Sequence, residues 1–420
     1  MRLLSGPLQS RAFRLLVIGS TVSLVGDGIY SVAMAVAALR TANPTSTLAM
    51  VAVAGLLPRI VFGLLGGVLA DRVSRRLILL AADLVRLAVV TTLGFALLDG
   101  ATGPWLLVIC VVPLGAASGA AAPAFSAILP DIVDEADLVA ANSVMGAAAP
   151  FAQMMLGPVL GGVLASVDVG AAMFADAGTF AVSAICVLLL RPVRQHEAGM
   201  NSNQARRSLP WADFREGLAY VRRTPWLLVN LLCGVLVSFA VSGSFTMLPL
   251  LVTRGYGAPS QSFGYLLAVG GVAATGTAVV IGMLRPRRRP LASSYLMYVV
   301  GLCAVAGLGL APDVWVGALF IALMFVGATA GNIWQDTILG SRIPRRLRGR
   351  VSSLDWVAGT VSAPLSIAVS AFLVGQVGIR QTFVGAGAVA SLGSLLGLLL
   401  LLRSGEPEPV IDPSDVTLAA

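Results

Sequence analysis

Long apolar runs dominate this sequence of 420 residues and restrict its fold more than any other feature. Twelve runs have about the 20 residues that an α-helix needs to cross roughly 30 Å of hydrocarbon. Transmembrane β-strands would instead show segments of about 10 residues with alternating polarity. The runs lie near residues 13–38, 47–70, 77–98, 104–129, 139–165, 170–190, 226–252, 260–284, 291–311, 314–340, 351–376 and 381–402. The sequence therefore predicts an all-α integral membrane protein with about 12 transmembrane helices.

The composition agrees with a membrane location. Hydrophobic residues make up 57% of the chain and charged residues only 11%, whereas soluble domains carry about 25% charged residues. Arg2, Arg11 and Arg14 lie before or at the start of the first run, as basic residues do before the apolar region of a signal peptide, but this run contains Asp27 and leads directly into further apolar runs. We therefore expect a retained first helix and not a cleaved signal sequence.

The basic residues indicate the orientation of the chain. All 28 of them are arginine, against 20 acidic residues, a balance that also occurs in nucleic-acid-binding domains. With the N-terminus inside, the outer loops hold only Arg40, Arg254 and Arg380. The inner loops hold Arg72, Arg75, Arg76 and the arginines within 191–223, 285–289 and 342–350. This positive-inside pattern predicts two cytoplasmic termini in a bacterial cytoplasmic (inner) membrane, and it argues against nucleic acid as a partner.

The longest polar stretch separates six apolar runs from six others. Within it, Trp211, Phe214, Leu218 and Val221 recur at helical spacing, which predicts an amphipathic helix lying on the inner membrane surface. A constant offset of 214 residues aligns features of the two halves, as repeated halves do in many secondary transporters. The predicted parts are an N-terminal six-helix bundle (1–190), a cytoplasmic linker with the amphipathic helix (191–225), a C-terminal six-helix bundle (226–403) and a disordered cytoplasmic tail (404–420).

The loop after the second run, Gly67-Val68-Leu69-Ala70-Asp71-Arg72-Val73-Ser74-Arg75-Arg76, carries an acid and three arginines in fixed order. It resembles the signature loop of the major facilitator superfamily, although Ser74 replaces the usual second glycine. The resemblance implies that Gly67, Asp71, Arg72, Arg75 and Arg76 help to close an inner gate between two helix bundles. The alternative is a simple cytoplasmic anchor. The matching loop at 285–290 has no acid, so we expect the gate to be asymmetric.

The fifth run contains Gly157, Pro158, Gly161 and Gly162, which resemble the core of a motif associated with exporters of this superfamily. Proline removes a backbone donor and bends a helix, and glycines let a partner helix approach. Such a bend could form an outer seal that favours antiport, whereas the alternative is tight helix packing alone.

Further residues resemble one branch of the superfamily, the macrolide-efflux and enterobactin-exporter branch of drug:proton antiporters. They lie mainly in the N-terminal half. They include Phe13-Arg14-Leu15-Leu16, Gly26-Asp27 with Tyr30, Pro58-Arg59 and Asp83-Leu84-Val85-Arg86. The resemblance implies the major facilitator fold, with two six-helix bundles related by pseudo-two-fold symmetry.

Charged residues inside apolar runs are functional candidates, because a charge in a bilayer costs several kcal/mol. At 1.5 Å per residue, Asp27 lies about 21 Å and Arg59 about 17 Å from the inner edge. They are therefore predicted to pair. Protonation of Asp27 would release Arg59 and couple a proton to bundle movement, so Asp27 is a proton or cationic-substrate site. The alternative is a static Asp27–Arg59 bridge.

The other intramembrane charges support narrower predictions. Asp83 and Arg86 stand three residues apart on one helix face, which favours a structural pair over a relay. Asp336 and Asp355 lie near inner ends of their runs, beside the arginines of 342–350, and are predicted to form salt bridges of the inner gate. The sequence indicates no partner for Asp176.

Several other classes of site are not expected. The four cysteines lie in apolar runs without metal-ligand spacing, and the one histidine, His196, lies in the linker. A chain without lysine has no Walker-type phosphate loop. We therefore expect no catalytic residues, no metal, no cofactor and no enzyme activity.

These features together predict a secondary active efflux transporter, a proton antiporter that exports an amphiphilic organic compound by alternating access. Its cavity would be mostly apolar, which suits drugs, antibiotics, siderophores or secondary metabolites better than sugars. The expected partners are this small molecule, protons and membrane lipid, and the protein is expected to be a monomer. Two alternatives stay open: an uptake symporter of the same fold, and a non-transporting membrane sensor or assembly protein. The polar groups expected in the cavity are Asp27, Arg59, Gln153, Asn230 and Gln335.

Overall fold

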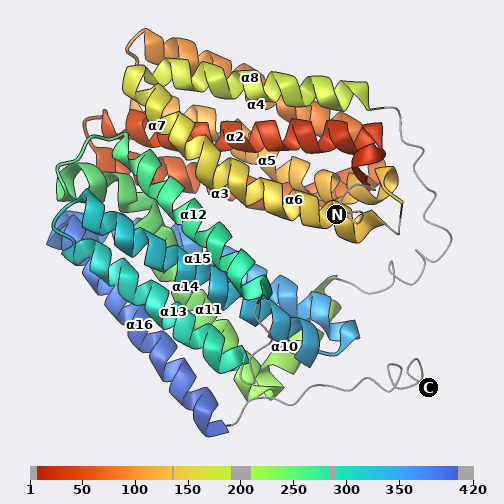
Figure 1. Ribbon diagram of the computed structural model, residues 1–420, viewed down its shortest axis with the longest axis vertical. Coiled ribbons are helices and arrows are strands. Elements are labelled where there is room, and N and C mark those ends of the chain that lie inside the picture. Colours follow the sequence, from red (N-terminus) through yellow and green to blue (C-terminus); the bar gives the residue numbers. More distant parts are fainter. Residues whose placement is uncertain (1–6, 135–136, 191–209, 284–289, 405–420) are drawn as a thin grey trace. The chain divides into compact units, whose positions relative to one another are not determined.

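The computed structural model describes residues 7–134, 137–190, 210–283 and 290–404 of the chain. These ranges are almost entirely helical, and no β-strand occurs within them (Figure 1). Twelve of the helical segments are long and apolar enough to cross a membrane. The predicted all-α architecture with twelve spans is therefore confirmed.

The first six spans consist of five uninterrupted helices and one composite helix. The uninterrupted ones are α2 (Arg11–Leu39), α3 (Pro44–Arg72), α4 (Arg75–Leu98), α5 (Pro104–Ile132) and α8 (Val169–Leu189). The composite fifth span consists of α6 (Leu138–Pro150), the π-helix η2 (Phe151–Leu156) and α7 (Gly157–Val167).

The later elements begin with the short helix α10 (Pro210–Arg223). The spans that follow are α11 (Pro225–Leu250) with the π-helix η3 (Leu251–Gly255), α12 (Ser262–Met283), α13 (Pro290–Leu310), α14 (Val314–Arg342), α15 (Arg345–Val377) and α16 (Ile379–Ser404).

Local sequence signals account for many of the helix starts. Ser10, Asp168 and Asp313 each accept a hydrogen bond from a backbone N–H in the first turn of α2, α8 and α14, because a helix N-terminus leaves such donors free. Proline, which has no N–H to leave unsatisfied, stands at the first position of α3, α5, α10, α11 and α13.

The chain forms two compact units. Of the described residues, unit 1 contains 7–134, 137–190 and 246–272, and unit 2 contains 210–245, 273–283 and 290–404. In unit 1, α2 packs on α8 and α7, α4 packs on α8 and α5, and α3 packs on α5. In unit 2, α13 packs on α14 and α16, and α10 packs on α15. Since the unit boundaries cross α11 and α12, the division into bundles 1–190 and 226–403 stays a prediction.

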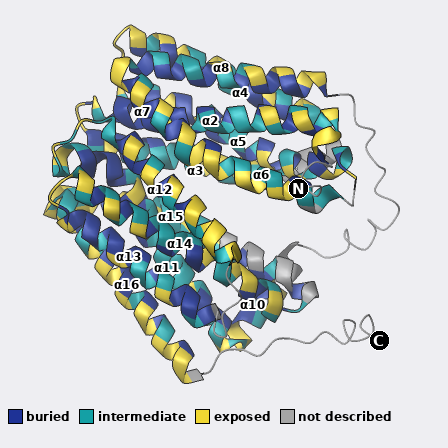
Figure 2. Cartoon of the chain, in the orientation of Figure 1, coloured by how far each residue is buried: buried dark blue, intermediate teal, exposed yellow. Residues whose placement is uncertain are grey.

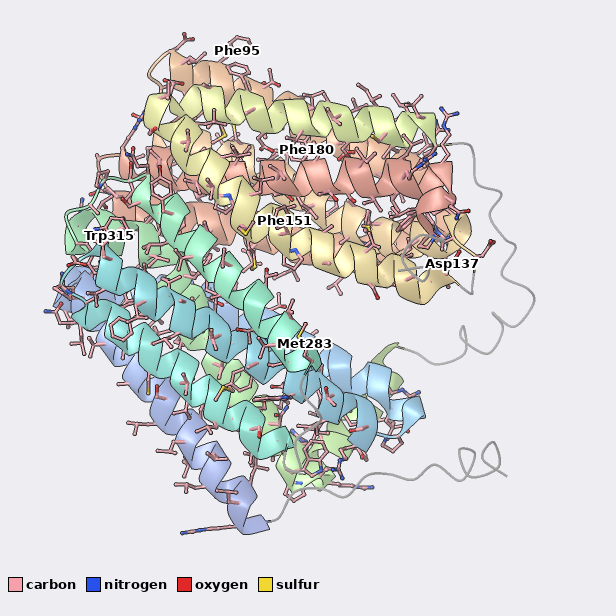
Figure 3. The ribbon with its side chains drawn as sticks, in the orientation of Figure 1. Phe95, Asp137, Phe151, Phe180, Met283 and Trp315 are labelled. Atoms are coloured by element: carbon pink, nitrogen blue, oxygen red, sulfur yellow. The ribbon has the colours of Figure 1, made fainter. Side chains whose placement is uncertain are left out.

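Exposed residues lie along most of these helices (Figure 2), and many of them are large and apolar. A soluble protein would bury such residues, whereas a membrane protein exposes them to lipid tails. Trp105 and Trp315 lie in the first turns of α5 and α14 and are 67% and 82% exposed. Figure 3 labels Trp315. Tryptophan is enriched at the membrane–water interface, and exposed tryptophans at the starts of spans agree with that tendency.

The predicted amphipathic segment forms α10, and part of its apolar face has a protein partner. Val221 is 1% exposed and joins a core cluster with Leu347, Val351 and Leu354 of α15. Glu216 of α10 also pairs with Arg350. Within unit 2, α10 is thus docked on the N-terminal part of α15, which its predicted place on the membrane surface did not include.

Candidate functional site

An ion pair with unusually little exposure lies inside unit 1. Asp83 and Arg86 of α4 are 3.6 Å apart, and their side chains are only 7% and 12% exposed. Ser183 of α8 donates a hydrogen bond of 2.7 Å to the other carboxylate oxygen of Asp83. The guanidinium of Arg86 lies 5.4 Å from the ring centroid of Phe180, which Figure 3 labels on α8. The pair therefore joins α4 to α8.

Asp27 of α2 belongs to the same charged region. It is half-buried, and the positive charges of Arg86 and Arg59 both act on it. Arg59 lies on α3 and is exposed. In the described part of the chain, no ion pair within 4.0 Å joins Asp27 to Arg59. Arg86 is thus a second cation for Asp27, and the sequence, which associated Arg86 with Asp83 alone, did not indicate it.

Asp176 of α8 is the third carboxylate of this region, and its side chain is completely buried. It interacts electrostatically with Asp27 and Arg86. The spacing of Asp176, Thr179 and Ser183 places all three on one face of α8, and this helical periodicity is the signal that could have revealed it. We call these four residues the charge cluster: Asp27, Asp83, Asp176 and Arg86.

The signature loop is held within unit 1 by its arginines. Ser74 caps α4 by accepting a hydrogen bond from the N–H of Leu77, which explains why serine suits a position where the family pattern has glycine. Arg75 pairs with Asp131 of α5 and donates to the carbonyl of Ala127 at 2.9 Å. Asp131 is a partner in this loop region that the sequence did not indicate.

Arg76 caps the C-terminal end of α8. It donates to the carbonyls of Val187 and Leu188, at 3.0 and 2.5 Å, in the last turn of α8. Carbonyls at a helix C-terminus lack intrahelical partners and favour a nearby positive charge. The side chains of Gly67, Asp71 and Arg72 lie outside the described residues, although the backbone is helical to Arg72. Their role in an inner gate stays a prediction.

The glycines of the fifth span permit close helix contacts on two sides. A Cβ added at Gly157 would meet backbone atoms of Val25 and Gly28, and one at Gly161 would meet backbone atoms of Ile29, all in α2. A Cβ at Gly162 would instead meet Gln261, just before α12. Pro158 cannot supply the α-helical N–H for the carbonyl of Met154, and that carbonyl lies against Gly271 of α12. Within unit 1, the motif therefore packs between α2 and the first part of α12.

Polar groups also gather in unit 2. Tyr298 of α13 contacts the amide oxygens of Asn332 and Gln335 on α14, at 2.7 and 2.8 Å. Asn230 is 3% exposed and accepts a hydrogen bond from Tyr295, so it lies in the core of the unit. Gln153, on η2 of unit 1, is exposed.

The two acids predicted for the inner gate also lie in unit 2. Asp336 of α14 is exposed and Asp355 of α15 is half-buried. Both act electrostatically on Tyr298. The predicted arginine partners are only partly visible, because several side chains between 345 and 349 lie outside the described residues.

The arrangement in unit 1 has a clear chemical meaning. Three carboxyl groups lie near one mostly buried guanidinium, and a change in protonation of any of them changes the attraction between α2, α4 and α8. Such a cluster can bind protons, or a cationic group, and link that binding to helix movement.

Known proteins of similar sequence are membrane transporters. An enterobactin exporter, EntS, of Citrobacter koseri is 27% identical over 414 residues, covering 96% of this chain and 95% of that protein. Macrolide efflux protein A of Streptococcus pyogenes is 23% identical, covering 88% and 91%. The solved structure of a mutant of the nucleoside transporter NupG superposes with a TM-score of 0.75 and covers 94% of this chain and all of its own. At 11% identity, this likeness shows the fold alone.

The family model of the Major Facilitator Superfamily matches residues 16–367, which include the charge cluster, the signature loop and the glycine motif. The superfamily consists of transporters of small molecules, and the twelve apolar spans agree with a multi-pass membrane protein. On this match and this fold, the chain belongs to the major facilitator superfamily of membrane transporters.

Proposed function

We propose that this protein is a proton antiporter that exports an amphiphilic organic compound from the bacterial cytoplasm. The observation that carries the proposal is the charge cluster, where three aspartates from three spans interact electrostatically with Arg86 and one of them, Asp83, forms an ion pair with it. Burying charges in a membrane costs free energy, and a purely structural protein gains little from carboxyl groups that must be compensated. A transporter needs them to bind and release protons.

Asp27 is the proposed exchange site for the proton. It is the least buried of the three aspartates, so water or substrate reaches it more readily than the other two. When Asp27 gains a proton it loses its attraction to Arg86 on α4 and Arg59 on α3. This change alters the relative free energies of two arrangements of the helices, which is what coupling to alternating access requires.

Export and an organic substrate are supported by the relatives. An enterobactin exporter and a macrolide efflux protein both align over nearly the whole chain, at 27% and 23% identity. Drugs, antibiotics, siderophores and other secondary metabolites are therefore the substrate classes to test. The arginine distribution supports a location in the cytoplasmic membrane with both termini inside. We propose that the unit of transport is a monomer.

Two motifs support proposals for the ends of the transport path: the signature loop for the inner gate and the glycine motif of the fifth span for the outer seal. We propose that Gly67, Asp71 and Arg72 act at the inner gate, with Arg75 and Arg76 fixing the loop to α5 and α8. Asp336 and Asp355 of unit 2 are the proposed acidic groups on the other side of this gate. The close packing of Gly157 and Gly161 against α2 supports a role for that motif in sealing the outer end of the transport path.

Accumulation of compounds in bacterial cells tests the direction of transport. A panel of macrolides, other amphiphilic drugs and siderophores is measured in cells that express the wild type, the Asp27→Asn variant or the Asp99→Asn variant. Asp99 is an exposed acid just after α4, so its loss controls for a change of one charge. We expect at least one compound to accumulate less with the wild type and Asp99→Asn, and to return to the level of non-expressing cells with Asp27→Asn.

Other outcomes of the accumulation test favour the alternatives. A compound that accumulates more when the wild type is expressed would indicate an uptake symporter. Equal accumulation of every compound in all strains, with the protein present in the membrane, would favour a non-transporting sensor or assembly protein.

A further inference from the structure

Asp176 is the most enclosed titratable group of the charge cluster, and the ordinary means of stabilising a buried carboxylate are nearly absent around it. Its side chain is 0% exposed, and its Oδ2 atom has no hydrogen-bond partner. Thr179 lies 3.4 Å from Oδ1 but donates more closely, at 2.7 Å, to the backbone carbonyl of Asp176. Since a hydroxyl has one hydrogen, the carboxyl group receives at most a weak share of it.

Asp176 points toward the helix that carries Asp27. A Cβ added at Gly26 of α2 would lie on top of the Oδ1 atom of Asp176 and the hydroxyl of Thr179. Glycine at position 26 therefore makes room for the carboxyl group of α8 directly beside Asp27. The hydroxyl of Tyr30, one turn further along α2, is also buried without a hydrogen-bond partner and interacts electrostatically with both aspartates.

The charges around Asp176 do not balance if all the carboxyl groups are ionised. Three aspartates face one mostly buried arginine, and Arg86 makes its ion pair with Asp83, which also receives the hydrogen bond of Ser183. Arg59 is exposed, so it is not a second buried counter-ion for these carboxyl groups. The groups acting on or lying beside the cluster, element by element, are Asp27 and Tyr30 on α2, Arg59 on α3, Asp83 and Arg86 on α4, Cys110 on α5, and Asp176 and Cys186 on α8.

We propose that Asp176 is a second proton-binding carboxyl group of the transporter, linked to Asp27 so that the two are not both ionised. A carboxylic acid at position 176 needs no counter-ion, and its O–H can donate where the carboxylate has no donor to accept from. When the proton moves to Asp176, the O–H bond of the acid at Asp27 breaks, an O–H bond forms at Asp176, and the negative charge passes to Asp27. Asp27 is then ionised beside Arg86 and Arg59.

A proton is the ligand that this geometry favours. Within the described residues, no group of three or more Asp, Glu, His or Cys side chains is arranged to hold a metal ion. The binding of a proton to Asp176 stands without any transport activity, but its place in a transport cycle rests on the proposed function.

Infrared spectroscopy of the full-length protein in lipid bilayers measures this proton directly, because a protonated carboxyl group has a carbonyl stretching band that a carboxylate lacks. Spectra are compared between the wild type and Asp176→Asn at neutral pH, with Asp99→Asn as the control for loss of an exposed acid. We expect a protonated-carboxyl band in the wild type and in Asp99→Asn that is lost or reduced in Asp176→Asn. A band of the same intensity in Asp176→Asn overturns the proposal.

A second variant keeps the test decisive if Asp176→Asn does not fold. Thr179→Val conserves shape but places a methyl group where the hydroxyl lies 3.4 Å from Oδ1. The hydroxyl donates mainly to the backbone, but its dipole lies beside the acid, so its loss should shift the frequency of the Asp176 band without abolishing it. An unshifted band overturns the assignment. Transport is measured separately: a band assigned to Asp176 without any transported compound rejects the proposed function alone, whereas Asp27-dependent transport without this band rejects only the second site.

Discussion

Among single residues, the arginines have two different roles: some hold neighbouring helices together at their ends, and one compensates carboxyl groups inside the spans. Arg75 and Arg76 lie at the start of α4, where they bond to an acid of α5 and to carbonyls of α8. Arg86 lies inside the spans, where water is scarce, and neutralises carboxyl groups. Burial makes the second kind far more sensitive to substitution, because a buried carboxylate left without its partner keeps the full cost of its desolvation.

Arg86→Gln is therefore expected to destabilise the protein. Breaking a buried ion pair costs about 3 kcal/mol, so the temperature of unfolding in detergent should fall clearly. The double variant Asp83→Asn with Arg86→Gln removes both charges and should recover part of the loss. Arg59→Gln, which removes an exposed arginine of a neighbouring span, is the control and should change the unfolding temperature little. Equal unfolding temperatures for Arg86→Gln and Arg59→Gln would contradict the central place of Arg86.

The sequence predicted those residue contacts that are local in the chain. The ion pair of Asp83 and Arg86 is predictable because the two residues lie three apart on one helix. The partners of Asp176 and Arg75 were not predicted, because Asp27 and Asp131 come from other helices and only tertiary packing brings them near. Asp27 was singled out by the cost of a charge in the membrane, which needs no knowledge of its neighbours.

At the scale of elements, glycine decides where helices come closest. Along α3 and α5, a Cβ at Gly115 would meet the backbone of Gly55, and one at Gly119 would meet the backbone of Arg59. Along α2 and α7 the same holds for Gly28 and Gly157. Small residues at such contacts let backbones pack closely, and this packing is one of the forces that associate helices in lipid.

Gly157→Ala should destabilise the packing of α7 on α2. The added methyl group has no space without movement of the backbone of Val25 or Gly28, and overpacking of this kind costs about 1–3 kcal/mol. Gly146→Ala, in the same span, is the matched control, because its added Cβ would meet no atom of another helix within 4 Å. Thermal unfolding of the two variants in detergent compares them. If both unfold at the wild-type temperature, the close contact at Gly157 is not a structural requirement.

We expect the buried apolar contact between α10 and α15 to contribute more to stability than their exposed ion pair. Val221→Asp places a charge where the native side chain is 1% exposed, and should release α10 and lower stability by about 3 kcal/mol. Glu216→Gln removes the ion pair with Arg350, in which the arginine and glutamate side chains are 28% and 44% exposed, and should change stability by less than about 1 kcal/mol. Trypsin digestion measures the release, since α10 contains Arg215, Arg222 and Arg223. Faster cleavage in Glu216→Gln than in Val221→Asp would contradict this ranking.

At the scale of the whole molecule, the hydropathy of the chain was enough to predict the number of spans, because a helix in lipid must be apolar over its full length. The π-helix within the fifth span was not predicted. Its turn of Phe151–Leu156 lies between Pro150 and Pro158, and the sequence indicated a bend but not how the backbone would form it.

Cysteine labelling tests the predicted orientation. In a variant without the four native cysteines, Ala101→Cys lies in a predicted outer loop and Ser414→Cys in the predicted cytoplasmic tail. A membrane-impermeant maleimide added to intact cells should label the first and not the second, and should label both after the cells are permeabilised. Labelling of Ser414→Cys in intact cells would reverse the orientation inferred from the arginines.

In the proposed mechanism, protons that bind at Asp27 drive export. The most direct measurement is proton movement across vesicles that contain the purified protein and an internal pH-sensitive dye. A macrolide or a catecholate siderophore is added on one side, and the wild type, Asp27→Asn and Asp99→Asn are compared. We predict that a compound exported by cells drives opposite proton movement with the wild type and Asp99→Asn, and none with Asp27→Asn. Transport of that compound without proton movement, or proton movement that persists in Asp27→Asn, would contradict the claim.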